Sequence, residues 1–74
     1  MIDPGTIQEL LDKDPFELFR IWISDGQQYV VSSPALAVPM ESILFLAMPK
    51  RDRFKLLSYQ NITSIEAPLT AAQA

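Results

Sequence analysis

The sequence predicts a mainly β fold, in which an N-terminal helix precedes a five-stranded, strongly bent antiparallel barrel. Helical spacing of apolar residues occurs near the start of the chain, and short apolar segments of strand period follow it, separated by turn residues. At 74 residues the chain is one domain. We expect the helix at about residues 6–14, the barrel at about 18–67 and a short tail at 68–74.

The predicted helix has recognisable start and stop signals. Thr6 and Glu9 have the spacing of a capping box, with Thr6 as the N-cap. Asp3, which precedes a proline, is an alternative cap one turn earlier. The apolar positions that share one face are Ile7, Leu10 and Leu11. Because Pro15 disfavours helical geometry at Asp14, the helix is expected to end there.

A β-hairpin is predicted around Asp25 and Gly26, which are typical of a two-residue type I′ turn. With that turn, Trp22 faces Tyr29 across the two strands. The residues expected on the core face are Phe19, Ile21, Ile23 and Val30. Two interpretations of the other face stay open: the N-terminal helix covers Trp22 and Tyr29, or they contact a partner, foremost a copy of the same chain.

Three further strands complete the predicted barrel. They are expected at residues 42–48, 54–58 and 62–66, with a tight turn or a short 3₁₀ helix at 59–61. Ile62 and Ile65 are expected on opposite faces of the last strand. Pro34 and Pro39 argue against regular sheet between the second and third strands. This order of elements is typical of small barrels of the SH3 type.

Half-apolar composition in so short a chain favours self-association. The chain is 49% hydrophobic and has no cysteine to cross-link a small core. The run at residues 43–46 has no polar face, which predicts a strand buried on both sides or paired across subunits. The residues predicted to form an oligomer or partner interface are Trp22, Tyr29, Ile43, Leu44, Phe45 and Leu46.

The composition argues against an enzyme. Without histidine or cysteine there is no Cys/His zinc site, no cysteine nucleophile and no imidazole base. Asp12, Asp14 and Glu17 fit no metal-binding loop and are expected to be solvated charges. We therefore assign no catalytic, cofactor-binding or metal-binding residue. No apolar run suits a signal peptide or a membrane span, so a cytoplasmic location is expected.

Charge is unevenly distributed along the chain. Residues 1–25 contain six acidic and two basic side chains, a net −4, whereas residues 50–55 contain four basic and one acidic, a net +3. This basic segment is interpreted as a solvated loop, as a partner for the acidic segment of a neighbouring copy, or as an RNA contact. The candidate RNA-binding residues are Lys50, Arg51, Arg53 and Tyr59. The overall acidic charge makes RNA the less favoured partner.

The stretch PFELFRIWISDG at residues 15–26, continued by Tyr29, Val31 and Pro34, resembles short uncharacterised bacterial proteins that read roughly PFEPFRIxLSDGRxYxVxHPE. Ser33 and Ala35 stand where those proteins often have His and Glu. The predicted topology also resembles the Sm-like (LSm) fold, which implies ring assembly through edge strands. It does not imply RNA binding, because residues 59–61 replace the Arg/Lys-Gly pair of the second Sm motif.

Together these observations predict a non-enzymatic, Sm-like domain that acts as a homo-oligomeric scaffold or protein-interaction module. The alternative is a divergent Sm-like ring that binds RNA.

Overall fold

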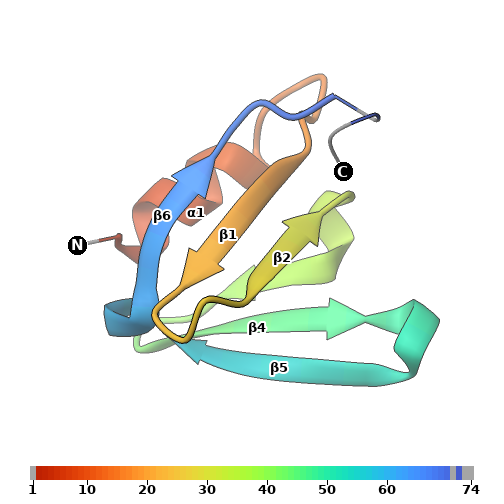
Figure 1. Ribbon diagram of the computed structural model, residues 1–74. Helices are drawn as coiled ribbons and strands as arrows, with labels where there is room; N and C mark the ends of the chain where they lie inside the picture. The colour runs from red at the N-terminus through yellow and green to blue at the C-terminus, as the bar shows by residue number, and fades with distance from the viewer. Residues whose placement is uncertain (1, 71, 73–74) are drawn as a thin grey trace.

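The computed structural model describes residues 2–70 and residue 72. One α-helix accompanies two three-stranded antiparallel sheets, with strand orders β2-β1-β6 and β3-β4-β5 (Figure 1). In chain order the elements are α1 (Pro4–Leu11), β1 (Phe19–Ile23), β2 (Gln28–Val31), the 3₁₀ helix η1 (Pro34–Leu36), β3 (Ala37–Pro39), β4 (Ile43–Met48), η2 (Pro49–Arg51), β5 (Arg53–Ser58), η3 (Tyr59–Asn61) and β6 (Ile62–Glu66).

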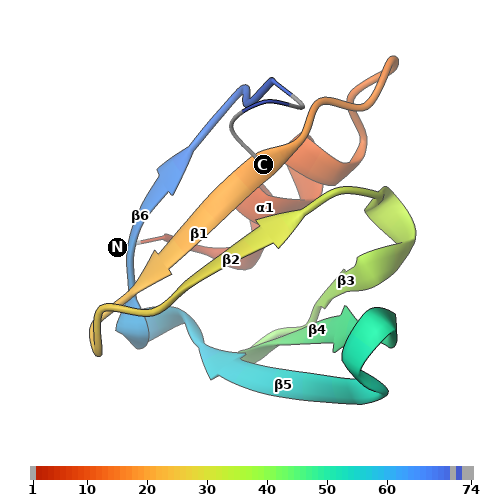
Figure 2. The same ribbon diagram turned by 45° about the vertical axis from the view of Figure 1, so that its right-hand side comes forward.

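The mainly β class is confirmed, whereas the five-stranded barrel is wrong. Six strands form two separate sheets, and neither closes into a barrel (Figure 2). The difference arises after β2, where Pro34 begins η1 and interrupts the extended chain. The chain then forms β3, which pairs with β4 and not with β2. Because no strand runs through both sheets, they remain separate.

Helix α1 begins at Pro4 and ends at Leu11, so the predicted range of 6–14 is shifted and too long. The alternative cap is the correct one. The Asp3 Oδ1 atom accepts hydrogen bonds from the Thr6 N–H at 2.9 Å and from the Thr6 hydroxyl at 3.0 Å. These bonds stabilise the carboxylate and lower the pKa of Asp3. Thr6 is therefore a donor to the cap and not the cap itself.

The hairpin between β1 and β2 has a three-residue turn in place of the predicted two-residue turn. The Gly26 N–H donates to the Ile23 carbonyl at 3.0 Å, and Gly26 has a φ of 88°. A left-handed residue after such a turn adds one residue to the loop and shifts the register by one. Ile21 therefore pairs with Tyr29, and Trp22 pairs with Gln28. The predicted Trp22–Tyr29 pair is wrong, since the two side chains lie on opposite faces of the sheet.

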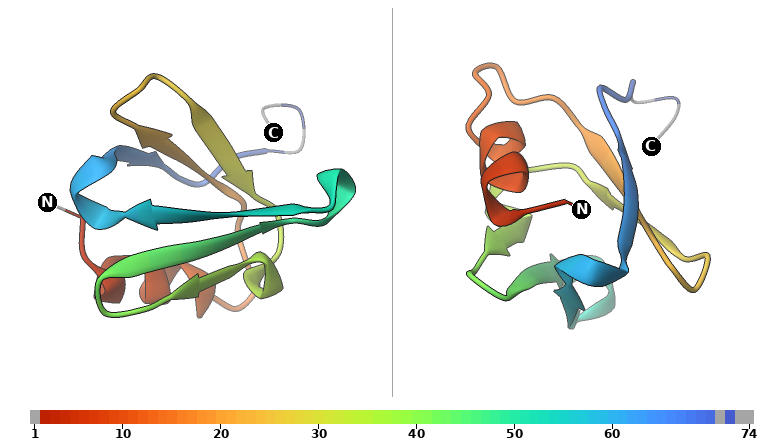
Figure 3. Two further views of the ribbon diagram at one scale, coloured as in Figure 1. Left: turned by 90° about the horizontal axis from the view of Figure 1, so that it is seen from below. Right: turned by 90° about the vertical axis from the view of Figure 1, so that its left-hand side faces the viewer.

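The hydrophobic core lies between the inner faces of the two sheets and under α1 (Figure 3). Helix α1 contributes Ile7 and Leu11 to it. The sheets and η3 contribute Phe19, Ile21, Ile23, Val31, Ala37, Leu44, Leu46, Leu57, Tyr59 and Ile62. The register shift explains why Val31, and not the predicted Val30, is fully buried. The short helix depends on this contact, because eight residues have little helical stability alone.

A bulge in β6 changes which sides of the strand Ile62 and Ile65 face. Trp22 pairs with Ser64 but Ile23 pairs with Ile62, so Thr63 is the extra residue on β6. Ile62 and Ile65 therefore face the same side, opposite Ile23 and Ile21, and both pack on the core. Their predicted location on opposite faces is wrong.

Candidate interaction surfaces

The outer face of sheet β3-β4-β5 is apolar and exposed. The strand register places Val38, Phe45 and Leu56 side by side in one row across the sheet, with Phe54 beside Ala47 in the next row. The exposed fractions of Val38, Phe54 and Leu56 are 50%, 61% and 54%. The rings of Phe45 and Phe54 stack, with centroids 5.4 Å apart and an interplanar angle of 20°. We call these five residues the apolar face.

The apolar face has no charged side chain among its strand positions. Arg53 and Lys55 alternate with Phe54 and Leu56 along β5 and therefore point to the opposite side of the sheet. Ile43 and Ser58, which pair at the other end of β4 and β5, share the side of the apolar face. Depletion of charge is typical of the centre of a protein–protein interface.

The run at residues 43–46, predicted to be an interface, is divided between two environments. Leu44 and Leu46 have exposed fractions of 0% and 2% and belong to the core. Ile43 and Phe45 point to the outer face and are partly exposed. The strand therefore has one core side and one outer side, and only the outer pair is available to a partner.

Trp22 and Tyr29 occupy two different surfaces. Trp22 lies on the outer face of sheet β2-β1-β6, away from the core that α1 covers, with the Arg20 guanidinium 5.9 Å from its ring centroid. An ion pair of 3.0 Å joins the Arg20 Nη1 atom to the Glu66 carboxylate beside it. Tyr29 is on the inner side and packs against the core. Because the two residues lie on opposite faces of the sheet, their predicted interface roles become two separate hypotheses.

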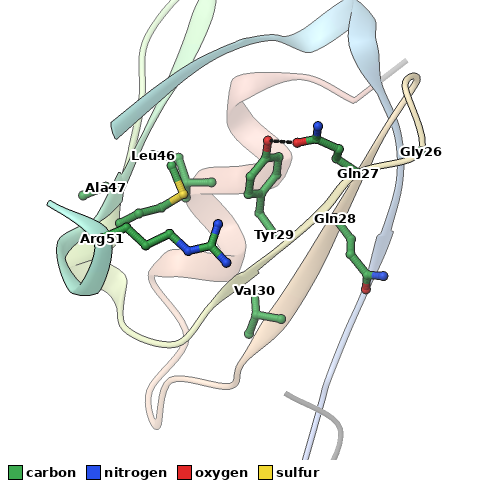
Figure 4. A pocket seen from close by; sticks show the side chains of 9 residues that line it. Gly26, Gln27, Gln28, Tyr29, Val30, Leu46, Ala47 and Arg51 are labelled. Atoms are coloured by element: carbon green, nitrogen blue, oxygen red, sulfur yellow. Dashed lines mark hydrogen bonds between the residues drawn. The ribbon is translucent and has the colours of Figure 1, made fainter. Parts of the chain in front are cut away.

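A groove separates the free edge of β2 from the end of β4. Its main part is a pocket of about 430 Å³ between residues 26–30 on one wall and Leu46, Ala47 and Met48 on the other (Figure 4). The Tyr29 hydroxyl donates to Gln27 Oε1 at 2.7 Å inside this pocket, and the Arg51 side chain extends from η2 into it. We call this space the β2–β4 groove.

The basic residues predicted to bind RNA gather at one end of the molecule. Lys50 and Arg51 are in η2, Arg53 starts β5, and all three are exposed. Lys55 lies nearby, with its Nζ atom 5.6 Å from the ring centroid of Tyr29. The structure brings Lys50, Arg51 and Arg53 together at this end, and it also places Arg51 in the lining of the β2–β4 groove, which the sequence did not show.

Tyr59 is not part of that surface. Its side chain is buried, with an exposed fraction of 5%. Its hydroxyl donates a hydrogen bond to the Met40 carbonyl at 2.6 Å, and this bond links η3 to the turn between β3 and β4. Burial raises the pKa of Tyr59 above its ordinary value of 10.0. A buried ring does not stack on nucleotide bases, so this position does not suit the predicted RNA contact.

Substituting Tyr59 by Phe is expected to lower the free energy of unfolding by about 0.5–1.5 kcal/mol at neutral pH, because the Met40 carbonyl loses its donor. Because the folded pKa is raised, the contribution of the neutral phenol is complete below pH 10 and is lost as the pH rises through the folded pKa. Urea denaturation between neutral pH and about pH 11 should show a smaller alkaline loss for Tyr59→Phe than for the wild type. Equal alkaline losses in the two proteins would contradict this role of Tyr59.

Within the described part of the chain, four large hydrophobic residues are exposed and were not predicted as interface residues, namely Val38, Met40, Phe54 and Leu56. The signal for two of them is the alternation of basic and apolar residues at 53–56, which predicts a strand with one apolar face. Val38 lies between prolines, where no strand was expected.

Neither a metal centre nor a membrane-spanning helix is found within residues 2–70 and 72. No cluster of three or more potential metal ligands occurs there. No helix in this part of the chain has the length and apolar character needed to cross a membrane. Comparison with known proteins finds no matching family model, no matching curated protein and no matching solved structure.

Proposed function

We propose that this protein is a non-enzymatic, cytoplasmic self-association module that joins copies of its chain through the apolar face. One observation carries the proposal. Among the described residues, the large hydrophobic side chains with high exposure all belong to sheet β3-β4-β5 or to its first turn: Val38, Met40, Phe54 and Leu56. Contiguous apolar surface of this kind marks an interaction site, because its burial removes unfavourable contact with water.

A second copy of the chain is the partner that this surface fits best. Two copies related by a two-fold axis present the same face to each other, so an uncharged apolar face is complementary to itself. Two sheets that pack face to face bury their side chains between them, as in a β-sandwich. The stacked rings of Phe45 and Phe54 are already ordered, which lowers the entropic cost of binding.

Face-to-face packing is favoured over pairing of the β5 edges. Arg53 and Lys55 lie on β5, which is an edge strand. Charged side chains on an edge strand, lysine above all, oppose the addition of a further strand. Like charges from two β5 strands would also repel each other.

The association is tested by the mass of the native particle. We expect multi-angle light scattering at micromolar concentration to give a multiple of the 8.3 kDa chain mass. Replacing Phe54 and Leu56 together by serine should reduce the particle to the monomer, because both side chains supply exposed apolar area to the contact. The fold should persist, since neither residue belongs to the core.

The matched control is Trp22→Ala, which removes a large apolar side chain from the outer face of the other sheet. This variant should keep the wild-type particle mass. A monomeric wild-type protein would overturn the proposal, as would a double-serine variant that keeps the wild-type mass. A monomeric Trp22→Ala variant would assign the contact to the opposite sheet.

RNA binding is the second candidate function. It is favoured by the exposed side chains of Lys50, Arg51 and Arg53 at one end of the molecule, since cationic side chains pair with the phosphates of nucleic acids. The net charge of −3 opposes it. Retention of single-stranded RNA on filters at low salt, with a steep loss on adding salt, would support this candidate.

A further inference from the structure

The free edge of β2 has backbone groups without hydrogen-bond partners among the described residues. Strand β2 pairs with β1 on one side only. The Ile23 N–H donates to the Gln27 carbonyl, which places Trp22 and Gln28 in a pair that exchanges no backbone bonds. By alternation along the strand, the N–H and C=O groups of Gln28 and Val30 point away from β1.

These groups open into the β2–β4 groove. Gln28 and Val30 line the pocket of about 430 Å³, and Val30 also lines a second recess of about 230 Å³ that continues it toward η2. Ala47, Met48 and Arg51 line both spaces. The groove therefore follows β2 along its whole length, which at about 3.3 Å per residue suits roughly four to six extended residues.

The groove has apolar and basic walls. Leu46, Ala47 and Met48 form the wall opposite β2, and Lys50 and Arg51 stand at its η2 end. No carboxylate is among the residues that line either space, although Asp25 lies in the adjoining turn. The charge of the groove therefore complements an acidic ligand.

From these observations we propose that the β2–β4 groove binds an extended acidic segment of another protein as an added strand beside β2. A second extended backbone is the ligand that satisfies alternating N–H and C=O groups along a sheet edge. An apolar side chain of that segment would contact Met48, and acidic side chains would pair with Lys50 and Arg51.

The acidic stretch of the chain itself does not suit the groove. Residues 12–17 contain Pro15, which lacks the N–H that a ladder of hydrogen bonds requires. Lys13 and Glu17 within the stretch form an ion pair of 3.0 Å with each other. The acidic residue of β6, Glu66, is already engaged with Arg20. A different protein is therefore the expected source of the segment.

The probe for this proposal is a fluorescein-labelled peptide of alternating Glu and Val residues, added to the wild-type protein. Fluorescence anisotropy should rise on binding, and the NMR signals of the Gln28 and Val30 amides should shift and become protected from hydrogen exchange. A Lys/Val peptide and a Glu/Val peptide with methylated backbone nitrogens serve as controls. Both should bind at least about tenfold more weakly, the first by charge repulsion and the second by loss of donors.

Two substitutions with the same change in net charge distinguish a specific contact in the groove from an effect of the overall charge of the protein. Arg51→Glu should weaken binding of the Glu/Val peptide about tenfold, whereas Lys13→Glu, outside the groove, should leave it nearly unchanged. The Phe54→Ser/Leu56→Ser variant should still bind, because neither substituted residue lines the groove.

Three outcomes would overturn the proposal. Equal binding of the Glu/Val, Lys/Val and methylated peptides would exclude strand addition. Equal weakening by Arg51→Glu and Lys13→Glu would exclude a site at Arg51. A uridine oligonucleotide that shifts the Gln28 and Val30 amides when the peptide does not would assign the groove to nucleic acid.

Discussion

Leu44→Ala is expected to lower the free energy of unfolding by about 2–5 kcal/mol, because it leaves a cavity in a closely packed core. The Leu44 side chain is fully buried between the two sheets. A domain of this size has a total stability of roughly 4–11 kcal/mol. We therefore expect a large shift of the urea midpoint in circular dichroism, and extensive unfolding if the wild-type stability is at the low end.

The matched control is Leu56→Ala on the neighbouring strand. The chemical change is the same, but Leu56 lies on the apolar face and is 54% exposed. Its loss should cost less than about 1 kcal/mol in the monomer, while it weakens association. Both proteins are best compared with the wild type at concentrations where light scattering finds each as the monomer, so that association does not contribute to the unfolding energy. Similar costs at the two positions would show that the inner and outer faces of this sheet are assigned incorrectly.

Ile7→Ala is expected to destabilise the protein by about 2–5 kcal/mol and to reduce its helical signal. Ile7 is fully buried and is one of the two buried residues of α1. An eight-residue helix has little stability of its own, so loss of its main contact should release the helix as well as leave a cavity. Thermal and urea unfolding followed by circular dichroism measure both effects.

The control for this prediction is Glu9→Ala on the exposed side of the same helix. Alanine has the higher helix propensity, so this variant should match the wild type or exceed it slightly. A helix that stays folded in Ile7→Ala, with unfolding unchanged, would mean that α1 does not depend on the core.

The turn of the β1–β2 hairpin is one residue longer than the sequence predicted. Asp25 and Gly26 correctly predicted a turn between two strands. The pattern could not decide between a two-residue and a three-residue turn, because glycine suits the left-handed position of both. That single residue moved Tyr29 to the inner side and Val30 to the outer side. The predicted side of the sheet for each residue of β2 changed with this shift in register.

For the candidate sites, too, some features are evident from the sequence and others depend on the tertiary structure. The absence of histidine and cysteine limits the possible chemistry through composition alone, and the basic cluster at residues 50–55 is evident from its charge. Tyr59 was assigned to that cluster because it is an aromatic residue close to it in the sequence. Its location in the core follows from η3, which turns its side chain toward the carbonyl of Met40.

The sequence by itself determined most of the elements, with β3 as the exception, because strand and helix periods, turn residues and prolines act over a few neighbouring residues. It predicted the N-terminal helix, the hairpin, the 3₁₀ turn at residues 59–61 and the last three strands. The tertiary structure decided how those strands are grouped, which side of each strand faces the core, and which apolar residues are left over. Those outcomes depend on contacts between distant segments, such as β1 with β6, whose register shifts at a bulge that no local pattern specified. The apolar face and the β2–β4 groove exist only because the two sheets pack on one another without closing into a barrel.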